Sequence, residues 1–238
     1  MQLREREMLV GHFAVAFGAK RAFPRVSLGT LFLAAQFSDL LWPLFLLLGL
    51  EHVRIDPGNT AVTPLDFYDY PITHSLAAAI GWSIVVALIY YALHRDRWST
   101  AAVGFCVFSH WLLDFISHRP DLPLAFGRRA FFGLGLWNSL LGTFVFEMAL
   151  FILCAALYMR GTQAKDHIGM YGASSLVALL GVVYLANLFG PPPPSIAAIA
   201  VAGNALWPFV AWAYWIDRHR VPTLEPTRCG FHRRSGSP

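Results

Sequence analysis

The chain has 238 residues, of which 56% are hydrophobic and 13% charged, about half the charged fraction of a typical soluble domain. At roughly 20 apolar residues per span, this length accommodates about six membrane spans and excludes an additional soluble domain of ordinary size. The net charge of +4 comes from basic residues in short loops and the C-terminal tail, which is typical of membrane topology and argues against nucleic-acid binding. The three cysteines have no repeated spacing, which excludes a disulfide framework or a cysteine zinc motif.

Apolar segments of helical length follow one another along the chain. The first, Leu9–Ala19, is too short to span a membrane and is expected to form a short N-terminal helix, either re-entrant or interfacial. Six segments long enough to span come next: Ser27–Leu50, His74–Leu93, Ser99–His118, Phe131–Met159, Met170–Gly190 and Ser195–Ile216. The Pro191–Pro194 run predicts a stiff turn before the last segment. We therefore predict an all-α, polytopic membrane helix bundle of about six transmembrane helices plus a short N-terminal helix.

The basic residues predict the orientation of this bundle. We expect one integral membrane domain over residues 1–221 and a disordered basic tail over residues 222–238. With both ends of the chain on one side, fourteen Lys and Arg residues lie on that side and four lie on the other. Because cytoplasmic loops are enriched in Lys and Arg, both termini are predicted to be cytoplasmic. If Leu9–Ala19 crosses the membrane, the count becomes twelve against six and the bundle keeps its orientation.

His110, Asp114 and His118 interrupt the third long apolar segment at a spacing of i, i+4 and i+8. On a helix these three side chains share one face. Ionisable groups are costly at membrane depth and usually face a bundle interior, a cavity or an ion. The imidazole of His110 and the carboxylate of Asp114 suit zinc and related metals. The simpler alternative is a buried Asp–His hydrogen bond that joins two helices.

Two other segments carry a candidate ligand each. Asp39 lies near the middle of its segment without a neutralising neighbour in sequence, so we expect a metal or a histidine from another helix as its partner. The alternative is a protonated Asp39 bonded to a backbone carbonyl that the Pro43 kink frees. His74 follows Thr73, a potential N-cap, and is expected to open a helix at the outer membrane surface. There it either binds a ligand or faces water.

The predicted depths separate these residues. His74 and His118 fall near the outer ends of their helices, whereas His110 lies about 12 Å below His118. His74 and His110 can therefore share an ion only if the loop of residues 66–73 enters the bundle, and His118 is a reserve ligand.

Two ionisable residues are expected away from this group. His12 is cytoplasmic and remote from the other histidines unless Leu9–Ala19 inserts toward the outside. Glu147 falls toward the inner half of its segment, and we interpret it as a structural pair rather than a catalytic acid.

Four short motifs, taken in chain order, resemble those of a known family: Gly11-His12, Asp39 at the end of an apolar run, Thr73-His74-Ser75, and Ser109-His110-x-x-x-Asp114. The family is the uncharacterised membrane-bound, metal-dependent hydrolases, also described as LexA-binding, inner-membrane-associated hydrolases. The resemblance covers roughly residues 9–125. It implies a bacterial inner-membrane location and a site in which the following residues bind a metal or lie beside its ligands: His12, Asp39, His74, His110 and Asp114.

The chain departs from the family pattern at two places. A Pro-Asp-x-Asp-His block is replaced by Ser38–Trp42, so a carboxylate and a histidine are missing and the resemblance supports one metal rather than two. The family pattern also has a Gly-His-Arg sequence before Thr-His-Ser. Residues Tyr68–Ile72 stand in its place here, and Asp69 among them could serve as a ligand or base instead.

These observations lead to the hypothesis of a hydrolase that uses a divalent metal, with zinc the leading choice, held by His110, Asp114, His74 and Asp39. A metal-activated water would attack a lipid-like ester or phosphoester, with Asp69 or Asp39 as the general base. Membrane lipid is the expected partner.

Two rival hypotheses use the same residues. The first is a non-enzymatic transporter or an ion or proton relay, although no internal repeat supports alternating access. The second is a b-type haem bound by His74 together with His110 or His118.

Overall fold

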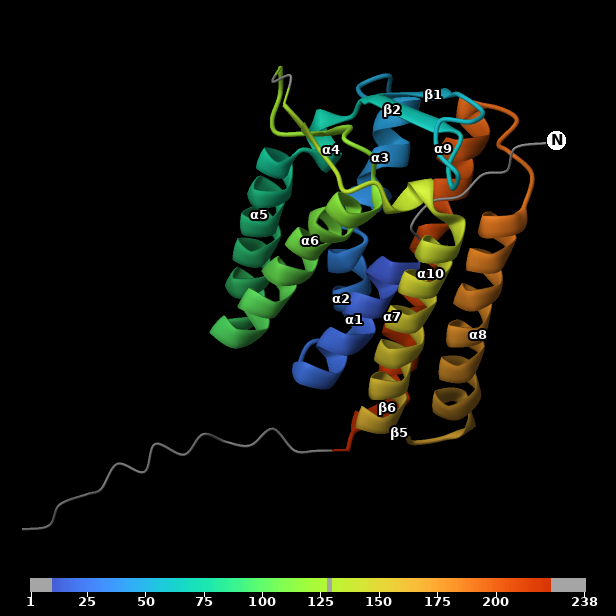
Figure 1. Ribbon diagram of the computed structural model, residues 1–238. Helices are drawn as coiled ribbons and strands as arrows, with labels where there is room; N and C mark the ends of the chain where they lie inside the picture. The colour runs from blue at the N-terminus through green and yellow to red at the C-terminus, as the bar shows by residue number, and fades with distance from the viewer. Residues whose placement is uncertain (1–9, 128–129, 224–238) are drawn as a thin grey trace, which may run out of the picture.

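The computed structural model describes residues 10–127 and 130–223, which form an all-helical bundle with short strand pairs at its two ends (Figure 1). Five stretches of this described part are long and apolar enough to cross a membrane: α5 (Leu76–His94), α6 (Arg97–Ser117), α7 (Leu140–Gly161), α8 (His167–Phe189) and Ile196–Arg218. The last stretch is made of α9 (Ile196–Asn204) and α10 (Leu206–Arg218). The predicted fold class, a polytopic membrane helix bundle, is confirmed.

A bent pair of helices forms either a sixth, broken span or a re-entrant loop. α2 (Leu28–Ala35) and α3 (Phe37–Leu47) are together long and apolar enough to cross a membrane but meet at an angle of 54°, with Gln36 between them. The helical hydrogen-bond pattern is interrupted at this bend, and the carbonyl of Ala35 at the end of α2 accepts from a side chain of another helix. This bend lies next to the candidate site.

Side-chain caps define where most of these helices begin. A Ser or Asp side chain accepts a hydrogen bond from the first turn of six helices, at the following positions: Ser27, Ser75, Asp96, Ser139, Asp166 and Ser195. Such caps satisfy backbone N–H groups that have no partner within the helix. The predicted cap Thr73 is wrong, because Ser75 caps α5 and Thr73 lies in the short preceding helix α4 (Pro71–His74). The fourth apolar segment becomes helical only at Leu140, after a 3₁₀ turn at Leu136–Asn138 (η1).

The short N-terminal helix α1 (Val10–Ala22) lies inside the bundle rather than at an interface, where it packs against α7, α2 and α6 (Figure 1). Phe13 and Phe17 are completely buried and contact Phe32 with ring centroids 4.8 and 5.1 Å apart. At the other end of α1, the buried Lys20 forms an ion pair of 2.8 Å with Asp217 of α10. The interfacial alternative for this segment is therefore wrong, because its apolar side chains fill the centre of the core.

Strand pairs cover the two ends of the bundle. At one end β1 (His52–Ile55) pairs antiparallel with β2 (Leu65–Asp69) above α3 and α9, and β3 (Leu122–Pro123) pairs with β4 (Phe131–Phe132). At the opposite end β5 (Thr162–Ala164) pairs with β6 (Arg220–Pro222) (Figure 1). The first residue of the predicted disordered tail thus belongs to a strand, and residues 224–238 lie outside the described part.

Basic residues are unequally divided between these ends. In the described ranges, nine lie at or beside the β5–β6 end: Lys20, Arg21, Arg25, Arg95, Arg97, Arg160, Lys165, Arg218 and Arg220. The β1–β2 end has Arg54 and Arg119. The charge asymmetry predicted from sequence therefore exists between the two ends of the folded bundle.

Candidate metal centre

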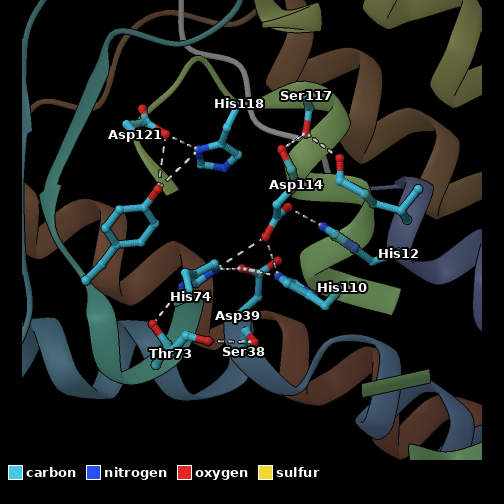
Figure 2. Close-up of polar contacts among 12 residues, drawn as sticks. His12, Ser38, Asp39, Thr73, His74, His110, Asp114, Ser117, His118 and Asp121 are labelled. Carbon is cyan, nitrogen blue, oxygen red and sulfur yellow. Dashed lines mark hydrogen bonds and ion pairs between the residues drawn. The ribbon is translucent and has the colours of Figure 1, made fainter. Parts of the chain in front are cut away.

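Five ionisable side chains from four helices converge in the bundle interior, just below the β1–β2 end (Figure 2). They come from α1, α3, α4 and α6 and are His12, Asp39, His74, His110 and Asp114. Four of them are buried, and the side chain of Asp39 is 24% exposed. The structure thus brings together the five residues that the family resemblance placed at the metal.

The histidine nitrogens and aspartate oxygens of this cluster lie 3.3–3.9 Å apart, the longest separation being that between His74 Nε2 and Asp114 Oδ2. His110 Nε2 lies 3.4 Å from Asp39 Oδ1 and 3.3 Å from Asp114 Oδ2, and His74 Nε2 lies 3.4 Å from Asp39 Oδ1. On the other side, His12 Nε2 lies 3.3 Å from Asp114 Oδ1. Within the described part of the chain, His110 Nε2 and Asp114 Oδ2 are buried without a hydrogen bond.

Most of these separations match the spacing of ligands around a metal ion. Zinc binds histidine nitrogen and carboxylate oxygen at about 2.0–2.2 Å, so ligand atoms at the corners of a tetrahedron lie about 3.3–3.5 Å apart. Two overlapping groups have all their ligand atoms within 4.8 Å of one another, one with His12, His110 and Asp114 and the other with Asp39, His74 and His110. The donor set and its geometry therefore fit a divalent ion.

The bend between α2 and α3 orients His110. Its Nδ1–H donates a hydrogen bond of 2.8 Å to the carbonyl oxygen of Ala35, the last residue of α2. Because a carbonyl only accepts, Nδ1 carries a proton, and Nε2, which faces the two aspartates, is the nitrogen that can bind an ion once it is deprotonated. A backbone partner of this kind is what commonly fixes the tautomer of a metal-binding histidine.

A buried glutamate orients His74 through a threonine. The Thr73 hydroxyl donates to Glu51 Oε2 at 2.6 Å and lies 2.6 Å from His74 Nδ1, so it accepts the Nδ1–H of His74 and leaves Nε2 free to bind a ligand. Glu51 Oε1 also accepts the backbone N–H groups of Ile72 and Thr73. Ser38 Oγ donates to Thr73 O at 3.0 Å (Figure 2). Sequence reasoning missed Glu51, which has no motif around it.

These contacts resolve the predicted difference in depth between His74 and His110. Thr73, His74 and Ser75 are buried, so the segment that was expected at the membrane surface enters the bundle. The rings of His74 and His110 have centroids only 5.4 Å apart. The prediction that His74 opens a surface helix is therefore wrong.

His12 belongs to the cluster because α1 is inserted in the core. Its ring stacks on His110 with centroids 3.8 Å apart. The N–H of Gly11 donates to Glu147 Oε2 at 3.4 Å, so Glu147 supports the start of α1 next to the site. The predicted remote positions of His12 and Glu147 are both wrong. For Glu147 the reason is that α7 begins only at Leu140, which brings this residue close to the β1–β2 end.

Asp69 does not join the site. Its Oδ2 accepts from His52 Nδ1 at 2.9 Å, and both side chains are about half exposed, at 48% and 47%. The two residues are cross-strand neighbours in the β1–β2 pair, which holds Asp69 on the outside of the bundle. The prediction of Asp69 as a general base therefore lacks a geometric basis.

His118 lies one turn beyond Asp114, outside the two candidate ligand groups. Its Nδ1–H donates to Asp121 Oδ1 at 2.9 Å, and the Tyr70 hydroxyl donates to the same oxygen at 3.1 Å. Burial, together with the charge of Asp121, holds the pKa of Tyr70 well above its usual value, so the phenol remains a proton donor. His118 is thus engaged by a carboxylate rather than by the five-residue cluster.

A small cavity connects His118 with the cluster. Its volume is about 20 Å³, and it is lined by His12, Asp39, Trp42, Phe67, His74, Asp114, His118 and Trp137. This is enough for about one water molecule or one ion. It is far too small for a porphyrin between His74 and either neighbouring histidine, so this geometry does not support the haem hypothesis.

The fold and the site together define a polytopic helical membrane protein with a His/Asp cluster in its interior whose donor atoms could hold a metal ion. Comparisons with family models, curated proteins and solved structures gave no match to this chain. The chemistry of the cluster is therefore the basis for a functional proposal.

Proposed function

We propose that this protein is a metal-dependent hydrolase of the bacterial inner membrane that acts on a lipid-like ester or phosphoester. The observation that carries the proposal is the set of N–O separations of 3.3–3.9 Å among His and Asp side chains in the bundle interior, two of whose atoms lack hydrogen bonds within the described residues. Burying such groups without partners is costly, and a bound cation would compensate them.

Four residues of the site would bind an ion directly, and a fifth contacts one of these four. His74, His110, Asp39 and Asp114 would bind it, and His12 reaches the second oxygen of Asp114. A divalent ion such as zinc would lower the pKa of a water molecule enough to supply hydroxide near neutral pH. The single-water volume of the cavity and its aromatic wall limit bulk water around the reacting group.

The surroundings of the cavity support the proposed substrate class. The cluster is inside a membrane bundle, and Trp42, Phe67 and Trp137 belong to the lining of the cavity beside it. An apolar molecule with one hydrolysable group suits such surroundings better than a water-soluble metabolite. Since the cavity has room for one water-sized group, a substrate must displace part of this aromatic wall to enter.

The motif order Gly11-His12, Asp39, Thr73-His74-Ser75 and Ser109-His110-x-x-x-Asp114 supports the same class through its resemblance to membrane-bound metal-dependent hydrolases. The basic β5–β6 end is proposed to face the cytoplasm, which directs the cluster toward the opposite side of the membrane. The apolar core around Phe13 and Phe17 lies on the cytoplasmic side of the cluster and favours hydrolysis over a proton relay across the membrane.

Metal analysis of detergent-purified protein tests this proposal. We expect about one equivalent of zinc or a related ion in the wild type and less than a tenth of it in His110→Ala and Asp114→Ala. His52→Gln is the matched control, because it removes a histidine from a His–Asp pair outside the cluster. Circular dichroism and size-exclusion profiles establish that the variants are folded. A folded wild type without stoichiometric metal after zinc reconstitution, or two alanine variants that keep the metal, would overturn the proposal.

A further inference from the structure

His118 and Asp121 form a second polar group on the wall of the cavity that also contains the metal-ligand candidates (Figure 2). His118 ends the run of residues that shares one face of α6, and its N–H donates to Asp114 O at 2.7 Å. Its side chain is buried, yet it belongs to neither of the groups that could hold an ion. It therefore needs a role other than ligation.

Asp121 is held in place by three donors. Its Oδ1 accepts from His118 Nδ1–H at 2.9 Å and from the Tyr70 hydroxyl at 3.1 Å, and its Oδ2 accepts from Arg119 Nε at 3.2 Å. Arg119 in turn bonds to Asp66 on β2. A carboxylate fixed in this way keeps the proton of the imidazole on Nδ1 and leaves the lone pair on Nε2.

Aromatic rings surround the imidazole of His118. Its centroid lies 4.1 Å from that of Trp137, 5.1 Å from Phe67 and 6.1 Å from Tyr70. The described part of the chain offers no hydrogen-bond partner to Nε2, and the ring borders the cavity. The imidazole of His118 therefore has one nitrogen held by Asp121 and a second that has no partner among the described residues.

We infer that His118 is the proton-transfer residue of the hydrolysis and that Asp121 is its positioning residue. This inference rests on the proposed function. The oxygen of the attacking water forms a bond to the carbonyl carbon or the phosphorus, and one of its protons moves to His118 Nε2. When the bond to the leaving oxygen breaks, that oxygen keeps the electron pair and takes the proton from Nε2. Water and ester are thus converted to acid and alcohol, and His118 returns to its neutral form.

His118→Gln, which keeps the approximate size of the side chain, is the central test, and His94→Gln near the far end of α5 is the control. We expect His118→Gln to bind zinc with wild-type stoichiometry and to leave the absorption spectrum of the cobalt(II)-substituted protein unchanged. With p-nitrophenyl butyrate and bis-p-nitrophenyl phosphate as probes, kcat should fall about 10²- to 10⁴-fold. Asp121→Asn should also lower kcat while zinc binding is retained.

Nuclear magnetic resonance of ¹⁵N-histidine protein gives a readout that needs no substrate. We expect His118 as the Nδ1–H tautomer in the zinc-loaded wild type and a loss of that preference in Asp121→Asn. The inference is overturned by a His118→Gln enzyme with wild-type kcat, by loss of zinc from that variant, or by an Nε2–H tautomer. A zinc-loaded wild type that hydrolyses neither probe nor any lipid ester would instead overturn the proposed function.

Discussion

The imidazole rings of His12 and His110 stack nearly in parallel, with their centroids 3.8 Å apart and their planes inclined by 9°. Two imidazolium cations would repel each other at this distance in a buried site, whereas neutral rings can stack. Neutral imidazole is also the form that binds a metal ion. The stack therefore agrees with a cluster built for a cation, and it makes His12 an informative residue to change.

Replacing His12 tests whether it acts on the ion or only packs against His110. We expect His12→Gln to lower zinc affinity about 10- to 100-fold, because it removes the nitrogen that contacts Asp114 Oδ1, while His110→Ala loses stoichiometric zinc. Competition with a chromophoric chelator measures the affinity. An unchanged affinity in His12→Gln would restrict His12 to packing.

The hydroxyl of Thr73 should matter for metal affinity although it is not a ligand. Thr73→Val removes the group that connects His74 Nδ1 with Glu51, and we expect zinc affinity to fall about 10- to 100-fold. Thr73→Ser keeps the hydroxyl and should restore most of the affinity. Equal affinities in the Val and Ser variants would show that this contact does not orient His74.

Close packing between α2 and α10 requires a glycine at position 29. A Cβ on Gly29 would lie 2.2 Å from the ring of Tyr214, whose hydroxyl is 3.0 Å from Thr30 Oγ1 and cannot move freely. We expect Gly29→Ala to destabilise the protein by about 1–3 kcal/mol, seen as a lower Tm in detergent. Gly81→Ala is the control, since its Cβ meets no atom within 4 Å, and its Tm should stay the same or rise.

Asp96, which caps α6, should make the stability of the protein decrease at acid pH. Asp96 caps this helix, and its hydrogen bond from Ser99 Oγ holds the pKa of its carboxyl below the usual value. A carboxyl whose pKa is lowered on folding contributes stability above its unfolded pKa of about 3.9, and this stability is lost as the pH falls.

Asn caps a helix nearly as well as Asp but does not titrate, so Asp96→Asn should remove this part of the acid dependence. Measured from pH 6 to pH 3, the Tm difference between wild type and Asp96→Asn should shift in favour of the variant as the pH falls. A constant difference would mean that Asp96 does not contribute through its charge.

Cysteine labelling tests the orientation of the bundle. Ala61 near the β1–β2 pair and Ala164 in β5 are both exposed, at opposite ends, and Cys106 and Cys154 are buried. In a Cys229→Ser background, a membrane-impermeant maleimide applied to intact spheroplasts should label Ala61→Cys and spare Ala164→Cys. The reverse pattern would place the cluster on the cytoplasmic side.

The pattern of apolar and ionisable residues in the sequence by itself determined the class of fold and pointed to three of the five residues of the cluster. In a membrane, the backbone N–H and C=O groups of a long apolar segment find hydrogen-bond partners when the segment forms a helix. The membrane-spanning helices could therefore be predicted from the sequence. The spacing of His110 and Asp114 places both on one face of any helix, whatever its neighbours. Intramembrane Asp39 could also be assigned a partner on another helix, because an isolated carboxylate at that depth is costly.

Only the tertiary structure decided which distant residues complete the site. The bend at Gln36 frees the carbonyl of Ala35 for His110, and a four-residue helix held by Glu51 carries His74 into the interior. Neither effect can be predicted from hydropathy, because hydropathy gives the length of an apolar segment but not the direction in which its backbone runs. Insertion of α1 brings His12 beside His110, whereas strand pairing with His52 keeps Asp69 outside. These choices depend on packing between elements far apart in sequence, and local patterns do not encode such packing.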